Sequence, residues 1–346
     1  MKIIILDTSG LAGREAALAA VRRGHKVVAV GAQSAGIPEA ARHVRMDVSA
    51  TASLERLLLD EFPDAVVNTA ALGTPDACAQ DPTLATALNI TLPLTLARMA
   101  HHLSARLIHL STDLVFDGRP PHLPYAHTAT PAPTHLCGHT RLEGEKAILR
   151  HAKNFATALR VPPLLGNSPA NGAGQSPDPT WHEHLLATWA TNTPTPLPRA
   201  KLRQYLSADN LADVIVELCE RPPLTGIYHW AGTDALSPWD AARRLARHFN
   251  IPPALAEKLV PDPEPKDATQ CPNATSVEKK PPHPATTPIL DLRLDLHPLR
   301  GKLKTPAENF DTILARLAPP PPLRPWLASL SGKTLPLPRL VKGVDF

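Results

Sequence analysis

Cys137 and Arg141 are the residues whose types and spacing first suggest chemistry. They lie four residues apart in the stretch HLCGHTRLEGE, residues 135–145, at the start of a helix predicted to run from about residue 138 to 151. The i, i+4 spacing puts both side chains on one face of the helix. A thiol can donate a proton, but a neighbouring guanidinium lowers the thiol pKa and favours the thiolate, which is no acid. The pair suggests proton transfer beside a fixed positive charge, and the role of the thiol stays open.

A second stretch, residues 6–13 (LDTSGLAG), has the features of a phosphate-binding loop. It follows a short apolar strand, residues 2–6, and precedes a helix predicted over residues 14–23. A strand, a glycine-rich turn and a helix form the dinucleotide-binding arrangement, in which backbone N–H groups at the helix start bind the pyrophosphate. The predicted cofactor-binding residues of this loop are Asp7, Gly10, Leu11, Ala12 and Gly13.

Asp7 is unusual at the head of this loop, because its carboxylate would repel a pyrophosphate and take up space. One interpretation is a weakened or altered cofactor site. The other is that Asp7 points away and places its charge at the helix N-terminus, where it is favourable. The second strand, residues 25–30, is followed by Gly31-Ala-Gln-Ser34 with no acidic residue to hold the adenosine ribose. The choice between NADH and NADPH therefore stays open.

The elements that must position these residues alternate between strands and helices. Strands are predicted at residues 2–6, 25–30, up to 46–48, 65–68, 105–110 and 156–161, with helices between them, including a long one over 82–102. Strands such as VVAV and AVVN are apolar on both faces, as a covered parallel sheet requires. The fold class expected is α/β, a Rossmann-type doubly wound parallel sheet over residues 1–165 with a smaller C-terminal substrate lobe over residues 166–317. Residues 200–215 and 226–235 are candidates to return to the first domain.

The C-terminal third contains many of the 40 prolines. Residues 262–288 are predicted to form a proline-rich loop, and residues 318–346 a proline-rich tail that favours an extended polyproline conformation. The tail could bind a protein partner, or it could lie on its own domain, and the second interpretation is favoured.

Composition excludes several classes of protein. The net charge of +4 is mild and the basic residues are spread out, so no nucleic-acid partner is expected. The four cysteines form no CxxC pair, and the two histidines of Trp181-His-Glu-His184 do not share a helix face, so no metal site is expected. With no signal peptide or membrane span in the sequence, the expected location is the cytoplasm.

Several motifs follow one another along the chain: VNTAA (67–71), ALN (87–89), LSTDLVFDG (110–118), PY (124–125), PxP (131–133) and GxTxLEGE (138–145). Together they strongly resemble the dTDP-4-dehydrorhamnose reductases, a family of extended short-chain dehydrogenase/reductases, and the resemblance covers about residues 1 to 250. It implies NAD or NADP as cofactor, a nucleotide-linked sugar as substrate, and a homodimer by analogy. It also implies a catalytic Thr, a Tyr that protonates the ketone, and a Lys four residues later. These fall on Thr112, Cys137 and Arg141.

The resemblance assigns further residues. Those expected at the cofactor, besides the loop and Arg141, are Asp47, Val48, Ala70, Ala71 and Asn89. Those expected at the substrate are Asp113, Val115, Phe116 and Arg203, the last as a bidentate ligand of a nucleotide diphosphate or, equally, as half of a surface salt bridge.

Two functions follow from the changed positions. A Cys sulfur lies closer to its Cα than a Tyr hydroxyl by roughly a ring, so Cys137 should not reach a ketone, although Tyr125, His135 or His139 could supply the acid. The first hypothesis is an NAD(P)-dependent reductase of a nucleotide-linked 4-keto-deoxysugar with impaired catalysis. The alternative is a non-catalytic sugar-nucleotide- or NAD(P)-binding regulatory protein resembling the methionine adenosyltransferase β subunit.

Overall fold

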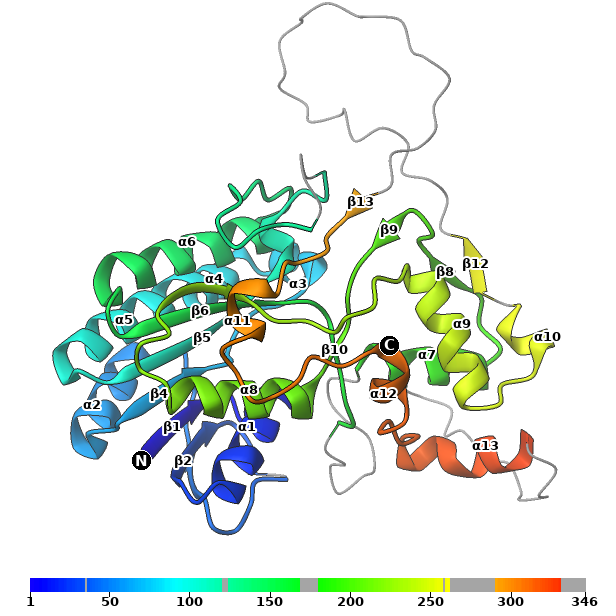
Figure 1. Ribbon diagram of the computed structural model, residues 1–346. Coiled ribbons are helices and arrows are strands. Elements are labelled where there is room, and N and C mark those ends of the chain that lie inside the picture. Colours follow the sequence, from blue (N-terminus) through cyan, green and yellow to red (C-terminus); the bar gives the residue numbers. More distant parts are fainter. Residues whose placement is uncertain (35, 120–123, 169–179, 258, 262–289, 331–346) are drawn as a thin grey trace, which may run out of the picture.

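The main sheet of this computed structural model has seven parallel strands in the order β11-β6-β5-β4-β1-β2-β3 (Figure 1). The structure describes residues 1–34, 36–119, 124–168, 180–257, 259–261 and 290–330. The strands are β1 (Lys2–Leu6), β2 (Lys26–Gly31), β3 (Arg42–Arg45), β4 (Ala65–Asn68), β5 (Arg106–Thr112), β6 (Ala156–Val161) and β11 (Gly226–His229). The order reverses at β1, so the carboxyl ends of β1 and β4 open a crevice where ligands of such sheets bind. The predicted fold class is confirmed.

Helices cover both faces of the sheet. Alternate residues of each strand point to opposite faces, and in these strands both sets are apolar. Ile3 and Ile5 of β1 pack in the cluster under α1 (Leu11–Arg22) and α8 (Ala208–Cys219). Ile4 and Leu6 pack in the cluster on the other face, under α2 (Thr51–Glu61), α5 (Leu92–Leu103) and α6 (Leu136–Ala152). Both faces of the strands are therefore buried, as their continuous apolar sequences predict.

The long helix predicted over residues 82–102 is interrupted. It consists of α4 (Pro82–Thr86), a π-helical turn (Ala87–Thr91) and α5, and the short helix α3 (Pro75–Gln80), which was not predicted, precedes it. Pro93, in the first turn of α5, lacks the N–H that a continuous α-helix would need. The wide turn directs Asn89 into the protein interior, where its side chain is fully buried.

The C-terminal lobe has its own apolar core. Its helices are α7 (Trp181–Ala190), α9 (Pro238–His248), α10 (Pro253–Ala256) and α12 (Phe310–Leu314). Three small parallel strand pairs tie the lobe together: β10 (Leu206–Ser207) with β7 (Leu164–Leu165), β12 (Leu259–Pro261) with β8 (Thr195–Leu197), and β13 (Leu290–Asp291) with β9 (Lys201–Leu202). The predicted loop over residues 262–288 lies outside the described residues.

Two segments from beyond residue 166 lie in the nucleotide-binding half. α8 packs on α1, and β11 pairs with β6 at the edge of the sheet. A third segment, which includes α11 (His297–Arg300) and residues 302–305, crosses over α8 (Figure 1). The domains are thus built from non-contiguous pieces of chain.

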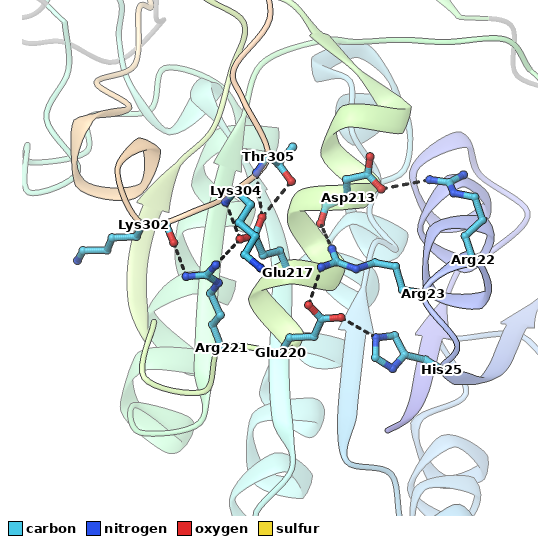
Figure 2. A network of polar contacts seen from close by, with 10 residues as sticks. All are labelled: Arg22, Arg23, His25, Asp213, Glu217, Glu220, Arg221, Lys302, Lys304 and Thr305. Carbon is cyan, nitrogen blue, oxygen red and sulfur yellow. Dashed lines mark hydrogen bonds and ion pairs between the residues drawn. The ribbon is translucent and has the colours of Figure 1, made fainter.

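A network of polar contacts fixes this crossing (Figure 2). The buried Glu217 of α8 accepts hydrogen bonds from the backbone N–H groups of Lys304 (2.6 Å) and Thr305 (3.1 Å) and pairs with Arg221 (2.7 Å). Arg221 in turn donates to the carbonyl of Lys302 (2.6 Å). On the other side of α8, Glu220 pairs with Arg23 and His25, and Asp213 with Arg22. The network holds α1, α8 and the returning C-terminal segment together.

The prediction of an extended tail is wrong for the part that the structure describes. Residues 321–323 form a 3-10 turn and α13 (Arg324–Leu330) follows, with Trp326 buried in the core of the lobe. The indole supplies enough apolar area to hold this short helix against the lobe. Residues 318–330 therefore lie on their own domain, while residues 331–346 lie outside the described part. None of the described helices is both long and apolar enough to span a membrane.

Candidate dinucleotide and active site

The loop after β1 has the backbone shape of a phosphate-binding turn despite its aspartate. Asp7 has φ +60°, in the left-handed region that aspartate tolerates better than most side chains. The Gly10 N–H donates to the Asp7 carbonyl (3.1 Å) and closes the turn. At Gly13 a Cβ would lie 2.3 Å from the Asp7 carbonyl oxygen, so only glycine fits there. Leu11 and Ala12 lie between the two glycines in the first turn of α1.

The carboxylate of Asp7 lies beside Gly10 at the start of α1, since a Cβ on Gly10 would be 3.2 Å from its Oδ2. This position is favourable beside the positive end of a helix. Asp7 also lines a pocket of about 470 Å³ at the carboxyl ends of β1, β2 and β3. The two interpretations of Asp7 are therefore not exclusive, because the same carboxylate stabilises the helix start and borders the pocket.

The remaining residues of this pocket come from the ends of β2 and β3. They are Gly31, Ala32, Arg45, Met46, Asp47 and Val48. Asp47 and Val48, assigned to the cofactor from sequence, thus share one cavity with the loop. The Asp47 carboxylate accepts hydrogen bonds from the backbone N–H and the hydroxyl of Ser49 (2.9 and 2.7 Å), which lower its pKa.

Asn89 positions the chain that follows β4. Its side-chain amide accepts a hydrogen bond from the Leu72 N–H and donates to the Leu72 carbonyl (both 3.1 Å), and it also donates to Thr140 (3.0 Å). Ala70 and Ala71 precede Leu72 on this segment, at the crevice. The structure gives Asn89 a positioning role, and direct contact of these three residues with a cofactor stays a prediction.

Cys137 is sealed in the protein. Its side chain is fully buried, and its Sγ faces the Leu72 carbonyl (3.7 Å), which also accepts a bond from the Cys78 thiol (3.3 Å). Burial and the neighbouring Cys78 raise the pKa of the Cys137 thiol to about 12, against a smaller lowering by Arg141. The group is a neutral thiol at pH 7 without access to solvent, so its assignment as a catalytic acid has no support in the geometry.

Arg141 is a buried cation without a hydrogen-bond partner. Its side chain is 6% exposed, and its Nε and Nη1 bond to no atom of the described chain. The two nearby carboxylates are paired with other arginines: Glu145 with Arg160 (2.7 Å) and Asp113 with Arg203. The unmet N–H donors fit the hydroxyl groups of a ribose, and the resemblance places the cofactor at this position.

Arg203 and Asp113 form a bidentate pair, with Nε–Oδ2 of 2.8 Å and Nη2–Oδ1 of 2.5 Å. Arg203 therefore forms a salt bridge, but not the surface one expected, because its partner Asp113 is fully buried. The pair joins the lobe to the main sheet. Thr112 caps the turn that carries Asp113, accepting a bond from the Leu114 N–H (3.2 Å). Contact of Thr112, Asp113 or Arg203 with a substrate stays a prediction.

Protein atoms cover the side chains of Val115 and Phe116 completely, and contact of these two residues with a substrate stays a prediction. Phe116 stacks on Tyr125 with ring centroids 4.0 Å apart. The Tyr125 hydroxyl donates to Asp117 (2.6 Å), and burial together with that carboxylate raises the pKa of Tyr125 above its usual value. Tyr125 is therefore bound internally and is not a substitute acid.

The histidines near Cys137 do not supply a replacement either. His135 caps α6, and burial together with Lys201, His139 and Arg203 lowers its pKa below the usual 6.5. It is neutral at pH 7 and cannot act as an imidazolium acid. His139 is exposed on the outer face of α6.

One feature that sequence reasoning missed is the fully buried ion pair of Glu145 with Arg160. Ser111 donates to the same carboxylate, and the Arg160 guanidinium lies over the Phe116 ring at 5.0 Å. The closing GE of the motif in residues 138–145 signals Glu145, but no local spacing signals its partner fifteen residues later. Among the described residues, no cluster of His, Cys, Asp or Glu could hold a metal ion.

A doubly wound sheet with a phosphate-binding turn, a pocket beside it and an altered Tyr–Lys pair defines a protein of the extended short-chain dehydrogenase/reductase type. The family model described as RmlD substrate binding domain matches residues 1–316, and the chain belongs to this family.

Two relatives of known sequence are similar to this chain over more than half of its length. Methionine adenosyltransferase 2 subunit beta of Xenopus laevis is 31% identical over 216 residues, 61% of this chain. The match spans 62% of the length of that protein. The probable low-salt glycan biosynthesis reductase Agl14 of Haloferax volcanii is 28% identical over 264 residues, 75% of this chain and 84% of that protein.

Solved structures share the fold at low identity. A dTDP-4-dehydrorhamnose reductase of Clostridium acetobutylicum superposes with a TM-score of 0.70 at 21% identity, over 91% of this chain and 97% of that chain. The Bacillus anthracis dTDP-4-dehydrorhamnose reductase in complex with NADP gives 0.68 at 16% identity, over 91% and 96%.

Proposed function

We propose that this protein binds an NAD(P)-type dinucleotide and acts as a non-catalytic regulatory subunit. The observation that carries the proposal is the contrast between the two halves of the site. The loop of residues 7–13 keeps its phosphate-binding shape and borders a pocket, whereas the residue at the position of the proton donor is a sealed thiol. Binding needs the first half only, and reduction of a ketone needs both.

Two sets of N–H donors would bind two parts of the dinucleotide. The N–H groups at the start of α1 would hold the pyrophosphate, and Arg141 would donate to the nicotinamide ribose. A bound nicotinamide would supply hydride chemistry, but the Cys137 thiol and the Tyr125 hydroxyl are buried, and the lowered pKa of His135 disfavours its acidic form. The similarity to methionine adenosyltransferase 2 subunit beta supports a regulatory role, with the catalytic subunit of that enzyme as the partner.

A second candidate is a reductase of a nucleotide-linked 4-keto-deoxysugar, of the dTDP-4-dehydrorhamnose reductase type. Thr112 and Arg141 favour it, because a hydroxyl and a cation remain at two of the three catalytic positions. The similarity to a probable glycan biosynthesis reductase also favours it.

The experiment combines binding with turnover on the full-length protein. Thermal shift and fluorescence titration with NADPH and NADH measure binding, since a ligand of the native state raises the melting temperature with concentration. Loss of NAD(P)H absorbance in the presence of dTDP-4-dehydrorhamnose measures reduction. We expect binding without reduction, whereas turnover would establish the second candidate and absence of binding would refute both.

The regulatory half of the proposal has its own test. Sedimentation velocity of the protein mixed with the methionine adenosyltransferase catalytic subunit of the same cells should give a heavier species. A variant ending at Leu330 keeps α13 and asks whether the tail contributes. Two separate species at micromolar concentrations would refute this partner.

A further inference from the structure

The pocket beside the phosphate-binding loop contains a cation that no described residue pairs with. Arg45 is the last residue of β3, it is exposed, and it lines the pocket. Its side chain makes no hydrogen bond or ion pair within the described chain. Arg42, on the same strand, pairs with Glu61 instead and does not line the pocket. Arg42 is thus neutralised, whereas the guanidinium of Arg45, a residue of the pocket wall, keeps its donors unpaired within the described chain.

The pairing of β2 with β3 places Arg45 beside the end of β2. Gly31, the last residue of β2, is the direct partner of Arg45 across the β2–β3 pair. In a doubly wound dinucleotide fold, the end of the second strand is where the adenosine ribose is read: an acidic residue binds its free hydroxyls, and an arginine accommodates a 2′-phosphate. Here β2 is followed by Ala32, Gln33 and Ser34, so none of the described residues directly after β2 is ionic, and the guanidinium of Arg45 lies on the neighbouring strand.

The carboxylates of the pocket do not take the place of the missing acid. Asp7 lies at the phosphate-binding turn, next to Gly10. Asp47 lies beyond the end of β3, and its Oδ1 already accepts two bonds from Ser49. At Gly31 a Cβ would lie 2.8 Å from the Ser9 hydroxyl oxygen, so the end of β2 has no room for a side chain that reaches the ribose.

We propose that Arg45 binds the 2′-phosphate of NADP(H) and makes this protein selective for NADP(H) over NAD(H). The inference rests on the proposed dinucleotide binding and adds the form of the ligand. A 2′-phosphate brings a charge of about −1.5 to −2 and three acceptor oxygens, which match the open donors of a guanidinium. This contact would not involve the nicotinamide half of the ligand, and it would not depend on a catalytic step.

The test compares four ligands on three proteins. The ligands are NADPH, NADH, adenosine 2′,5′-bisphosphate and 5′-AMP, and the proteins are wild type, Arg45→Gln and the control Arg42→Gln. Dissociation constants come from calorimetry or nucleotide fluorescence on the full-length chain. One charge-assisted contact at an exposed site is worth about tenfold in affinity. We expect wild type to bind the 2′-phosphorylated ligand of each pair about tenfold more tightly, and Arg45→Gln to lose that preference while Arg42→Gln keeps it.

The possible results distinguish a wrong assignment of Arg45 from a failure of dinucleotide binding. If both dinucleotides bind wild type equally, or if Arg45→Gln weakens all four ligands alike, the assignment of Arg45 is wrong and dinucleotide binding stands. The same holds if Arg42→Gln removes the preference as well. If none of the four ligands binds, dinucleotide binding itself is refuted, and the inference fails with it.

Discussion

Replacing Arg141 by Met should stabilise the free protein. Arg141 is 6% exposed, and its Nε and Nη1 find no partner in the described chain. An unsatisfied buried polar group costs about 1–3 kcal/mol, and more when charged. Met keeps most of the apolar stem and removes both unmet groups. Attraction to Glu145 offsets part of this gain, although Glu145 is already paired with Arg160. We expect the free energy of unfolding to rise by about 1–3 kcal/mol, within the range found when buried ionic groups are replaced by apolar ones.

The matched control is Arg106→Met. Arg106 is equally buried, at 5% exposure, but its guanidinium donates to Leu218, Phe155, Thr157 and Leu224. Removing it takes one donor from each of three carbonyls and a hydroxyl, although each carbonyl keeps a second donor, so this variant should lose about 1–3 kcal/mol. The two variants change the same atoms at the same burial, and opposite signs are expected only because one arginine is paired and the other is not.

Urea and thermal unfolding of the three proteins measure the effect. With about 2.1 cal/mol/K of unfolding entropy per residue, a chain of 346 residues shifts its midpoint by roughly 1–2 °C per kcal/mol. Arg141→Met should therefore melt about 1–4 °C higher without ligand, yet gain less on addition of dinucleotide. Destabilisation of Arg141→Met to the level of Arg106→Met would refute the reasoning, because it would mean that the guanidinium is satisfied in solution.

The sequence predicts the fold better than the site, for a physical reason. The strands of the main sheet are apolar on both faces, and this local property suffices to assign a covered parallel sheet. The lone charge of Arg141 depends instead on which carboxylates are left. Arg160 takes Glu145, and Arg203, far along the chain, takes Asp113. No local sequence pattern reveals which arginine pairs with which carboxylate, and none reveals that Val115 is buried.

Local rules also failed where tertiary packing decided the conformation. Proline content predicts an extended tail, but Trp326 gains enough by burial to hold a helix at residues 324–330. Helical periodicity over residues 82–102 does not reveal the π-helical turn that brings Asn89 inward, because the turn changes the direction of one side chain and leaves the helix axis nearly continuous.

Three further changes test other parts of the structure. Asp7→Gly removes a negative charge beside the expected pyrophosphate and suits φ +60° better, so dinucleotide affinity should rise about threefold to tenfold in a fluorescence titration; unchanged affinity would mean that the carboxylate does not face the ligand. Glu217→Gln should cost about 1–3 kcal/mol at pH 7 in urea unfolding, against less than about 1 for the exposed Asp213→Asn. Burial alone would raise the Glu217 pKa, but the hydrogen bonds that it accepts hold it below 4.5, so this contribution is present above that pH and fades as pH falls through the lowered pKa; a difference from wild type that does not shrink as the pH is lowered would contradict the assignment. A chain ending at Ala318 should be markedly less stable than one ending at Leu330, because only the shorter chain loses the Trp326 indole, and equal melting temperatures would show that the indole is not packed in solution.

Of the two unusual residues where a dinucleotide would bind, only Arg141 supports binding, because the Asp7 carboxylate would repel a pyrophosphate. Arg141 buries a charge that Met would remove, and its Nε and Nη1 have no partner in the described chain. Without a ligand, the protein would be more stable after Arg141→Met. A ligand with acceptor groups near Arg141 would offset the cost of burying that charge. If Arg141→Met raises the stability of the free protein and also reduces the rise in melting temperature caused by dinucleotide, the buried charge serves binding. The buried Cys137 thiol then explains why binding is not accompanied by proton transfer.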